Sequence, residues 1–247
     1  MKLTLAEPKY LKESVSIISE LVNEATFKIT KNAIELVAMD PANVAMVVFK
    51  LLSSTFVEYD VQEDTEIAIN LSNLKQVLRR AKPSDMLSLE VHENKLKIIL
   101  QGASKRTFSL PIIELEEKEQ KVPDLNFPIT ISAPSYVLSD AVEDVDIIGE
   151  SVSFMIDGKK LVISAESDLS EANIAIQETE EVKIMSDVSE VIKAKYSIEY
   201  LKKMMNAGKL VPEVKINFNK DYPLRLDYKA VDKIMLSFIL APRVEND

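Results

Sequence analysis

The side chains of this sequence that could do chemistry are mostly charged, because cysteine is absent and histidine occurs once. Without cysteine there is no disulfide, no thiol catalysis and no thiolate metal site. His92 falls in a predicted hairpin, where a solvated turn is a better interpretation than a catalytic or metal-binding role. The four glycines stand alone at 102, 149, 158 and 208, so no glycine-rich loop is present to hold nucleotide phosphates. Carboxylates and basic side chains are the remaining candidates.

Acidic side chains cluster at Glu143, Asp144 and Asp146, in a stretch with helical periodicity. Neighbouring carboxylates can bind a metal ion or transfer protons. Charge clusters of this kind are usually solvated helix faces, and we favour that interpretation here. We therefore expect no catalytic residue, no metal and no cofactor. An enzyme with a carboxylate-bound metal remains an alternative, which titration with Mg²⁺ or Mn²⁺ would separate.

Basic side chains gather on three of the four predicted helices, opposite an apolar face. Residues 72 to 84 contain no acid, and Lys75 and Arg79 lie one helical turn apart on the same stripe. Such a face is either an ordinary solvated surface or a set of phosphate contacts, and both interpretations stay open. The candidates for phosphate contact are Lys9, Lys12, Lys75, Arg79, Arg80, Lys202 and Lys203.

Periodicity predicts the elements that position these residues. Apolar residues at helical spacing predict helices at 9–23, 72–81, 134–147 and 197–207, with Ser72 as the N-cap of the second. Glu93 and Asn94 are expected to form a two-residue hairpin turn. Alternating apolar residues predict strands at 26–30, 33–39, 45–51, 66–70, 86–92, 95–100, 105–112, 151–156, 160–166, 171–178, 213–219, 223–229 and 233–240.

The chain repeats its pattern at an offset of about 126 to 128 residues. Pro8 recurs as Pro134 at the start of a helix, and the alternating Leu96, Ile98 and Leu100 recur near the C-terminus. A half-chain repeat indicates two similar domains rather than a solenoid. We predict an α+β fold with antiparallel sheets and two helices in each domain. The expected boundaries are 1–111 for the N-terminal domain, 112–128 for a charged, proline-containing linker and 129–247 for the C-terminal domain.

Composition is that of a globular protein, with 47% apolar and 28% charged residues. No apolar run approaches the roughly 18 residues of a membrane helix, and the first ten residues meet Glu7 and Pro8 before a signal-type core can form. We therefore expect a cytoplasmic protein without a membrane partner. The net charge of -10 does not exclude nucleic acid, because at physiological salt a charge acts over roughly 8 Å.

The order of several segments resembles the sliding clamps of the proliferating-cell-nuclear-antigen type, in their archaeal form. The resemblance covers essentially the whole chain, and its specificity comes from the order and spacing of its pieces together with the repeat. The segments that carry it are 21–25 (Leu-Val-Asn-Glu-Ala), 35–44 (Glu-Leu-Val-Ala-Met-Asp-Pro-Ala-Asn-Val), 70–81 (Asn-Leu-Ser-Asn-Leu-Lys-Gln-Val-Leu-Arg-Arg-Ala), 106–110 (Arg-Thr-Phe-Ser-Leu) and 240–244 (Leu-Ala-Pro-Arg-Val).

The resemblance implies a non-catalytic ring of three chains, in which six domains place twelve helices around duplex DNA. It implies tethering of DNA polymerase, clamp loader, flap endonuclease and DNA ligase, and hence association with the nucleoid. Carried over by position, the seven basic candidates fall on helices that face the hole. The acidic third helix departs from family members that carry basic residues there. A homotrimer, a specialised subunit of a heterotrimer and a regulator with a restricted set of partners all stay open.

The resemblance also implies two further surfaces. One is a groove under the linker that accepts a short peptide with apolar and aromatic anchors, and methionine suits a groove that several ligands share. The other joins the strand around 105–110 of one chain to the strand around 172–177 of the next. The groove candidates are Met39, Val44, Met46, Val122, Pro223, Ile239, Ala241 and Pro242, and the interface candidates are Lys105, Arg106, Phe108, Leu110, Asn173, Ile174 and Ile176.

Overall fold

The computed structural model describes residues 1–115, 120–186, 188 and 190–244. The chain divides into two compact units, and each takes a short segment from the other half of the sequence. The first unit is Met1–Asn43, Val47–Val122 and Lys229–Leu236. The second is Val44–Met46, Pro123–Tyr228 and Ser237–Asp247.

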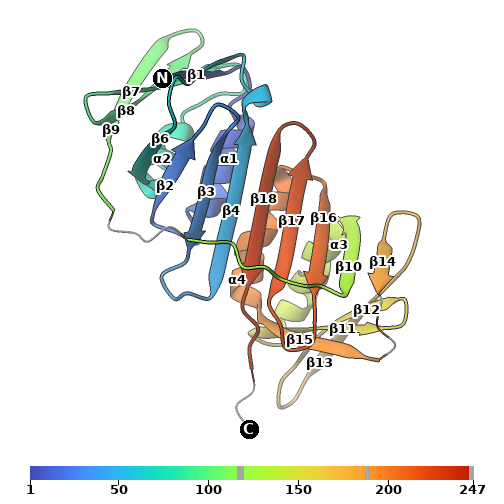
Figure 1. Cartoon of the computed structure of the whole chain (residues 1–247). Helices are drawn as coiled ribbons and strands as arrows, with labels where there is room; N and C mark the ends of the chain where they lie inside the picture. The colour runs from blue at the N-terminus through green and yellow to red at the C-terminus, as the bar shows by residue number, and fades with distance from the viewer. Residues whose placement is uncertain (116–119, 187, 189, 245–247) are drawn as a thin grey trace. The chain divides into compact units, whose positions relative to one another are not determined.

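The first unit combines two helices with antiparallel strands (Figure 1). The helices are α1 (Lys9–Ile18) and α2 (Leu71–Leu78), and a short 3-10 turn, η1 (Ser53–Thr55), follows β4. One sheet has the order β5 (Glu58–Asp60), β1 (Lys2–Leu5), β7 (Met86–His92), β8 (Lys95–Gln101) and β9 (Lys105–Pro111). The other strands lie in the order β4 (Ala45–Leu52), β3 (Ala33–Met39), β2 (Glu24–Ile29) and β6 (Thr65–Asn70).

The second unit follows the same plan. Its helices are α3 (Ser135–Asp146) and α4 (Ile198–Met205), and the 3-10 turn η2 (Asn206–Lys209) follows α4. One sheet has the order β13 (Glu171–Gln177), β12 (Lys160–Glu166), β11 (Ser151–Asp157) and β15 (Ile192–Ser197). The other strands lie in the order β14 (Lys183–Ser186), β10 (Ile129–Pro134), β16 (Glu213–Phe218), β17 (Leu224–Ala230) and β18 (Ile234–Leu240).

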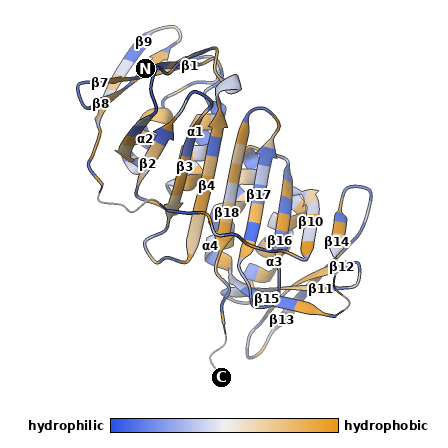
Figure 2. Ribbon diagram, viewed as in Figure 1, coloured by the Kyte–Doolittle hydropathy of each residue, from blue (hydrophilic) through white to orange (hydrophobic). Residues whose placement is uncertain are grey.

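Helices cover one side of the strands in each unit. In Figure 1, α1 and α2 lie behind β2 and β3, and α3 and α4 lie behind β16 and β17. Leu11, Val15 and Ile18 of α1 are buried at helical spacing, so one apolar stripe faces the core and leaves the other side of the helix to solvent. Figure 2 shows β18 apolar along much of its length, as expected of a strand with six of its seven residues buried.

Most predicted elements are present, and the differences have local causes. Strands 33–39, 86–92 and 160–166 have the predicted bounds. The first helix ends at Ile18 rather than 23, because residues 19–21 form a turn. Ser72 as N-cap is wrong: Asn70 caps α2, and its side chain accepts a hydrogen bond from the Asn73 backbone N–H at 3.0 Å.

Five strands were not predicted, namely β1, β5, β10, β14 and β15. Three of them, β1, β5 and β14, have four residues or fewer, which leaves too few alternations for periodicity to register. The hairpin turn at Glu93 and Asn94 is confirmed, since both residues have positive φ, 49° and 59°. Within the described ranges no helix combines the length and the apolar character needed to cross a membrane.

Candidate nucleic-acid interface and partner surfaces

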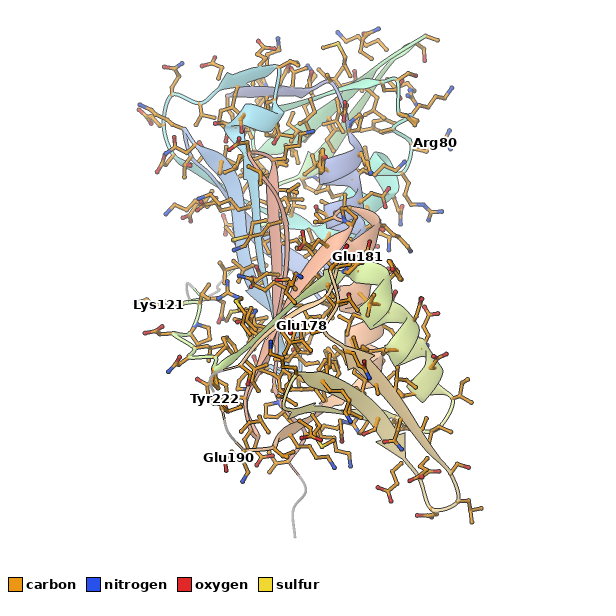
Figure 3. All side chains as sticks on the ribbon, turned by 90° about the vertical axis from the view of Figure 1, so that its right-hand side faces the viewer. Arg80, Lys121, Glu178, Glu181, Glu190 and Tyr222 are labelled. Carbon is orange, nitrogen blue, oxygen red and sulfur yellow. The ribbon has the colours of Figure 1, made fainter. Side chains whose placement is uncertain are left out.

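Among the basic candidates of the first unit, three are exposed and form no ion pair with another described residue: Lys9, Arg79 and Arg80. Lys9 begins α1, and Arg79 and Arg80 directly follow the last residue of α2. Leu74 and Leu78 anchor α2 in the core, which leaves its basic side in solvent. Figure 3 shows Arg80 at the outer margin of its unit, pointing away from the ribbon. These three residues can meet a phosphate without giving up another charged partner.

Lys12 and Lys75 are held by neighbours within the first unit. Lys75 forms an ion pair with Glu20, which lies in the turn after α1. The Lys12 ammonium donates a hydrogen bond to the Ala81 carbonyl oxygen at 3.0 Å, so it braces the segment that follows α2. Both basic side chains therefore tie α1 to the α2 region. A phosphate contact by either one requires an exchange of partners.

The two basic candidates of α4 in the second unit are also paired. Lys202 meets Asp146 of α3 at 2.5 Å, and Lys203 meets Glu199 one turn earlier on α4 at 2.7 Å. The hydrogen bond to Asp146 and the charge of that carboxylate raise the pKa of Lys202. Asp146, one of the acids of α3, thus neutralises the charge of a lysine on the neighbouring helix α4. Sequence reasoning missed this pairing, because the strands β11 to β15 lie between α3 and α4 along the chain.

The edge of the first unit at β9 carries a shallow hollow of about 280 Å³. Its lining comes from α2, from the second residue after it and from β9: Asn73, Gln76, Val77, Arg80, Phe108 and Leu110. Phe108 and Leu110 are half-buried and alternate along the strand with exposed residues such as Lys105. Among the described strands β9 pairs only with β8, so its outer edge is open.

The corresponding edge of the second unit is β13. Ile174 and Ile176 are half-buried, and they alternate along the strand with exposed residues such as Asn173. Within the described chain β13 pairs only with β12, so it too has an open edge with apolar side chains on one face. The predicted interface residues thus lie on two open edges, one in each unit.

Of the groove candidates, six lie in the second unit: Val44, Met46, Pro223, Ile239, Ala241 and Pro242. The Ala241 backbone N–H donates to the Val44 carbonyl oxygen at 2.9 Å. This bond brings Val44 beside the candidates near the C-terminus. Val44, Pro223, Ala241 and Pro242 are half-buried. Met46 and Ile239 are each 7% exposed, so packing accounts for most of their surface. Met39 and Val122 belong to the first unit, where Val122 is 40% exposed.

Two aromatic residues beside Pro223 were not singled out from the sequence. The rings of Phe127 and Tyr222 meet edge to face with centroids 5.8 Å apart. The Tyr196 hydroxyl donates to the Tyr222 carbonyl oxygen at 2.7 Å. Burial raises the pKa of Tyr196, so its hydroxyl stays protonated and serves as a donor. The signal of Phe127 and Tyr222 in the sequence was weak, because both lie in loops, where no periodic pattern marks them.

Carboxylate and imidazole groups do not assemble into a metal-binding cluster in the described ranges, where no group of three or more such residues has that arrangement. The acids of α3 project from the helix as exposed side chains. His92, at the end of β7, is 73% exposed.

Two family models match the chain one after the other. The N-terminal domain of proliferating cell nuclear antigen matches residues 1–120, and its C-terminal domain matches residues 121–243. A DNA polymerase sliding clamp from Nanoarchaeum equitans is 36% identical over 247 residues, 98% of this chain and 99% of that protein. One from Pyrococcus furiosus is 35% identical over 239 residues, 96% of both chains.

A solved structure agrees with these relatives. The crystal structure of proliferating cell nuclear antigen from Thermococcus kodakaraensis superposes with a TM-score of 0.91. It is 27% identical in sequence, and the match covers 98% of this chain and 99% of that one.

Proposed function

Since the chain belongs to the proliferating cell nuclear antigen family, whose archaeal relatives are DNA polymerase sliding clamps, we propose that it encircles duplex DNA and tethers replication proteins to it. The observation that carries this proposal is the pair of consecutive family models over residues 1–243. Three of the four helices, α1, α2 and α4, carry basic side chains on or directly after them, whereas α3 carries acidic ones. The alternative of a specialised subunit in a mixed ring gains no specific support from the relatives.

A sliding clamp must hold DNA without reading its sequence. Flexible lysine and arginine side chains that contact phosphates meet this need, because phosphate contacts position a protein without specifying bases. Closure of a ring then supplies the retention that weak contacts cannot. In this proposal Lys9, Arg79 and Arg80 make the first phosphate contacts, because they have no competing ion pair within the described chain.

The remaining basic candidates contact phosphate by exchange. Lys75, Lys202 and Lys203 leave Glu20, Asp146 and Glu199 when a phosphate approaches. Ion pairs at a solvent-exposed surface contribute little to stability, so this exchange has a small cost. Repeated exchange between carboxylate and phosphate suits a protein that slides, because no contact is strong enough to hold it in one place.

Ring assembly in this proposal uses the two open edges. β9 of one chain adds to β13 of the next, and Phe108 and Leu110 meet Ile174 and Ile176. The contact joins two different surfaces, so it is head to tail and closes into a ring if the rotation between copies closes. Three chains of two units each give the six-domain ring of the proposal. Asn173, Lys105 and Arg106 lie along the same edges.

The partner surface in this proposal is the set of half-buried residues in the second unit, Val44, Pro223, Ala241 and Pro242, with Met46 and Ile239 beneath. Short peptides with apolar and aromatic anchors from DNA polymerase, clamp loader, flap endonuclease and DNA ligase are its ligands. Met39 and Val122 stay predictions from the resemblance. The protein acts without catalysis of its own, and its DNA track places it in the cytoplasm with the nucleoid.

Light scattering of the purified protein near physiological salt tests the ring. We expect the mass of about three chains, the number in the proposed six-domain ring. A primer-extension assay on circular single-primed DNA should then show longer products when the protein and its loader are present. A stable monomer that never stimulates a polymerase would contradict the homotrimeric clamp. A monomer that stimulates only with a second clamp chain would support the mixed ring.

A further inference from the structure

β15 is the outermost strand of its sheet, and its inner edge pairs with β11 from Ser151 opposite Ser197 to Ile156 opposite Ile192. Its outer edge is occupied by two segments from elsewhere in the second unit. The Asp221 backbone N–H faces the Lys193 carbonyl oxygen at 3.4 Å, and the Arg243 backbone N–H donates to the Lys195 carbonyl oxygen at 2.7 Å. Carbonyls two residues apart point to the same edge of a strand, so one edge receives both segments.

The first of these segments, residues 221–223, is held at a second point. Tyr196 is fully buried, and its hydroxyl donates to the Tyr222 carbonyl oxygen at 2.7 Å. The Tyr222 ring, labelled in Figure 3, meets Phe127 edge to face. Asp221 has a positive φ of 47°, a conformation that needs support from its surroundings. Pro223 is therefore presented from a turn that β15 holds through backbone and side chain together.

The second segment, residues 241–243, is also held twice. Besides its backbone bond to Lys195, Arg243 reaches across to β11, where its Nη1 donates to the Ser151 hydroxyl oxygen at 2.7 Å. Its charge also helps to lower the pKa of Glu199 in the first turn of α4, after the larger effect of Lys203. Ala241 and Pro242 thus lie between two fixed points, the Val44 carbonyl on one side and the β15 edge on the other.

We propose that Arg243 and Tyr196 are positioning residues for partner binding, and that the outer edge of β15 is the platform on which they hold Ala241, Pro242 and Pro223. This inference rests on the proposed partner surface. Preorganised binding segments spare a ligand the entropic cost of ordering them. Loss of either anchor deletes no side chain that contacts the ligand, but it lets the backbone of those residues move. Affinity for the ligand therefore falls.

Three variants at one position separate the two bonds of Arg243. Arg243→Pro removes the backbone donor, Arg243→Ala removes only the guanidinium, and Arg243→Lys keeps a charged donor that can reach Ser151. The control is Lys31→Ala, which replaces an exposed lysine in the turn between β2 and β3. The probe is a fluorescent synthetic peptide with one leucine and two phenylalanine anchors. Amide hydrogen exchange at Ala241 reports the segment itself.

We expect Arg243→Pro to weaken peptide binding roughly two- to tenfold, the range for one net hydrogen bond, and to speed exchange at Ala241. Arg243→Ala should weaken binding less, and Arg243→Lys should restore it, whereas the mass and unfolding temperature stay those of the wild type. If Arg243 had only a structural role, its variants would change the unfolding temperature together with peptide binding, and Arg243→Lys would not restore binding at constant stability. Unchanged affinity and unchanged exchange in Arg243→Pro would overturn the inference.

Tyr196→Phe provides an independent second test, because it removes the hydroxyl and keeps the ring. The affinity of the same peptide should fall in Tyr196→Phe and not in Tyr136→Phe, whose side chain is exposed at the start of α3. If the wild type itself does not bind the peptide, the proposed partner surface is wrong and the positioning role falls with it. If the wild type binds and both anchor variants bind equally well, only the platform is wrong.

Discussion

The guanidinium of Arg106, on the edge strand β9, pairs with the carboxylate of Asp85, whose side chain is 3% exposed. The same carboxylate accepts a hydrogen bond from the Lys82 backbone N–H at 2.8 Å, and Arg106 Nη1 donates to the Arg80 carbonyl oxygen at 2.9 Å. Arg106 therefore connects the open edge of β9 to the turn that follows α2. The sequence predicted Arg106 as an interface residue, and in the free chain its guanidinium braces the edge from within.

Asp85 should make stability depend on acid pH. The hydrogen bond from the Lys82 backbone and the charge of Arg106 lower the pKa of its carboxyl. A lowered folded-state pKa gives stability that is present above the ordinary value of about 3.9 and is lost as the pH falls through the folded-state pKa. Urea unfolding should show Asp85→Asn less stable than the wild type near neutral pH, with a difference that shrinks below that ordinary pKa. The exposed Asp168→Asn serves as the control, and a difference independent of pH would contradict the assignment.

Gly102 should be intolerant of any side chain, because a Cβ atom there would lie 2.1 Å from Asp85 Oδ1. We expect Gly102→Ala to displace the Asp85 carboxylate and to lower the free energy of unfolding by about 1 to 3 kcal/mol, the usual range for overpacking. Gly149→Ala is the matched control, since its Cβ would meet the Glu166 carbonyl oxygen at an ordinary 3.7 Å. Thermal unfolding of both variants measures the effect, and equal stability of the two would count against this steric account.

Phe108 should control assembly without controlling folding. It is half-buried on the open edge and lines the hollow beside α2. A carboxylate placed there in an interface between copies would be desolvated without a partner. Phe108→Asp should therefore reduce the mass in solution from about three chains to one, while the circular dichroism spectrum stays unchanged. Thr107→Asp on the opposite, exposed face should still assemble, and assembly of both variants would exclude β9 from the ring contact.

Arg79 and Arg80 should account for more of the DNA affinity than Lys75. Each lost phosphate contact lowers the slope of log affinity against log salt by about 0.9, so Arg79→Ala with Arg80→Ala should lower it by about 2. Lys75→Ala should lower it less, because Lys75 already has a carboxylate partner in Glu20. Fluorescence anisotropy with short duplex DNA over a salt series measures the slope, with Lys31→Ala as the neutral-effect control.

Removal of the Glu20 carboxylate, which competes with phosphate for Lys75, should change the affinity for DNA in the opposite direction. Glu20→Gln frees Lys75 for phosphate and should strengthen DNA binding in the same anisotropy assay, most clearly at low salt where surface charges are least screened. Weaker binding in Glu20→Gln would show that Glu20 holds Lys75 in its phosphate-binding position instead of competing for it.

Short-range patterns in the sequence were sufficient for most of the elements, and the order of segments along the whole chain indicated the family. Alternation over seven residues predicted 33–39, 86–92 and 160–166 with the observed bounds, because burial on one face of a strand imposes that period on every residue. The half-chain repeat and the order of its segments indicated the clamp family before any coordinates.

The partners of the charges were decided by the tertiary structure alone. Lys75 meets Glu20 55 residues away, and Lys202 meets Asp146 56 residues away, so neither pairing has a local signal. The same holds for the outer edge of β15, which receives Asp221 and Arg243 only after the strands have assembled. Periodicity records which side of an element is buried, because burial acts on each residue separately. Contacts between distant segments depend on how whole elements pack, and that information is not contained in any short stretch of sequence.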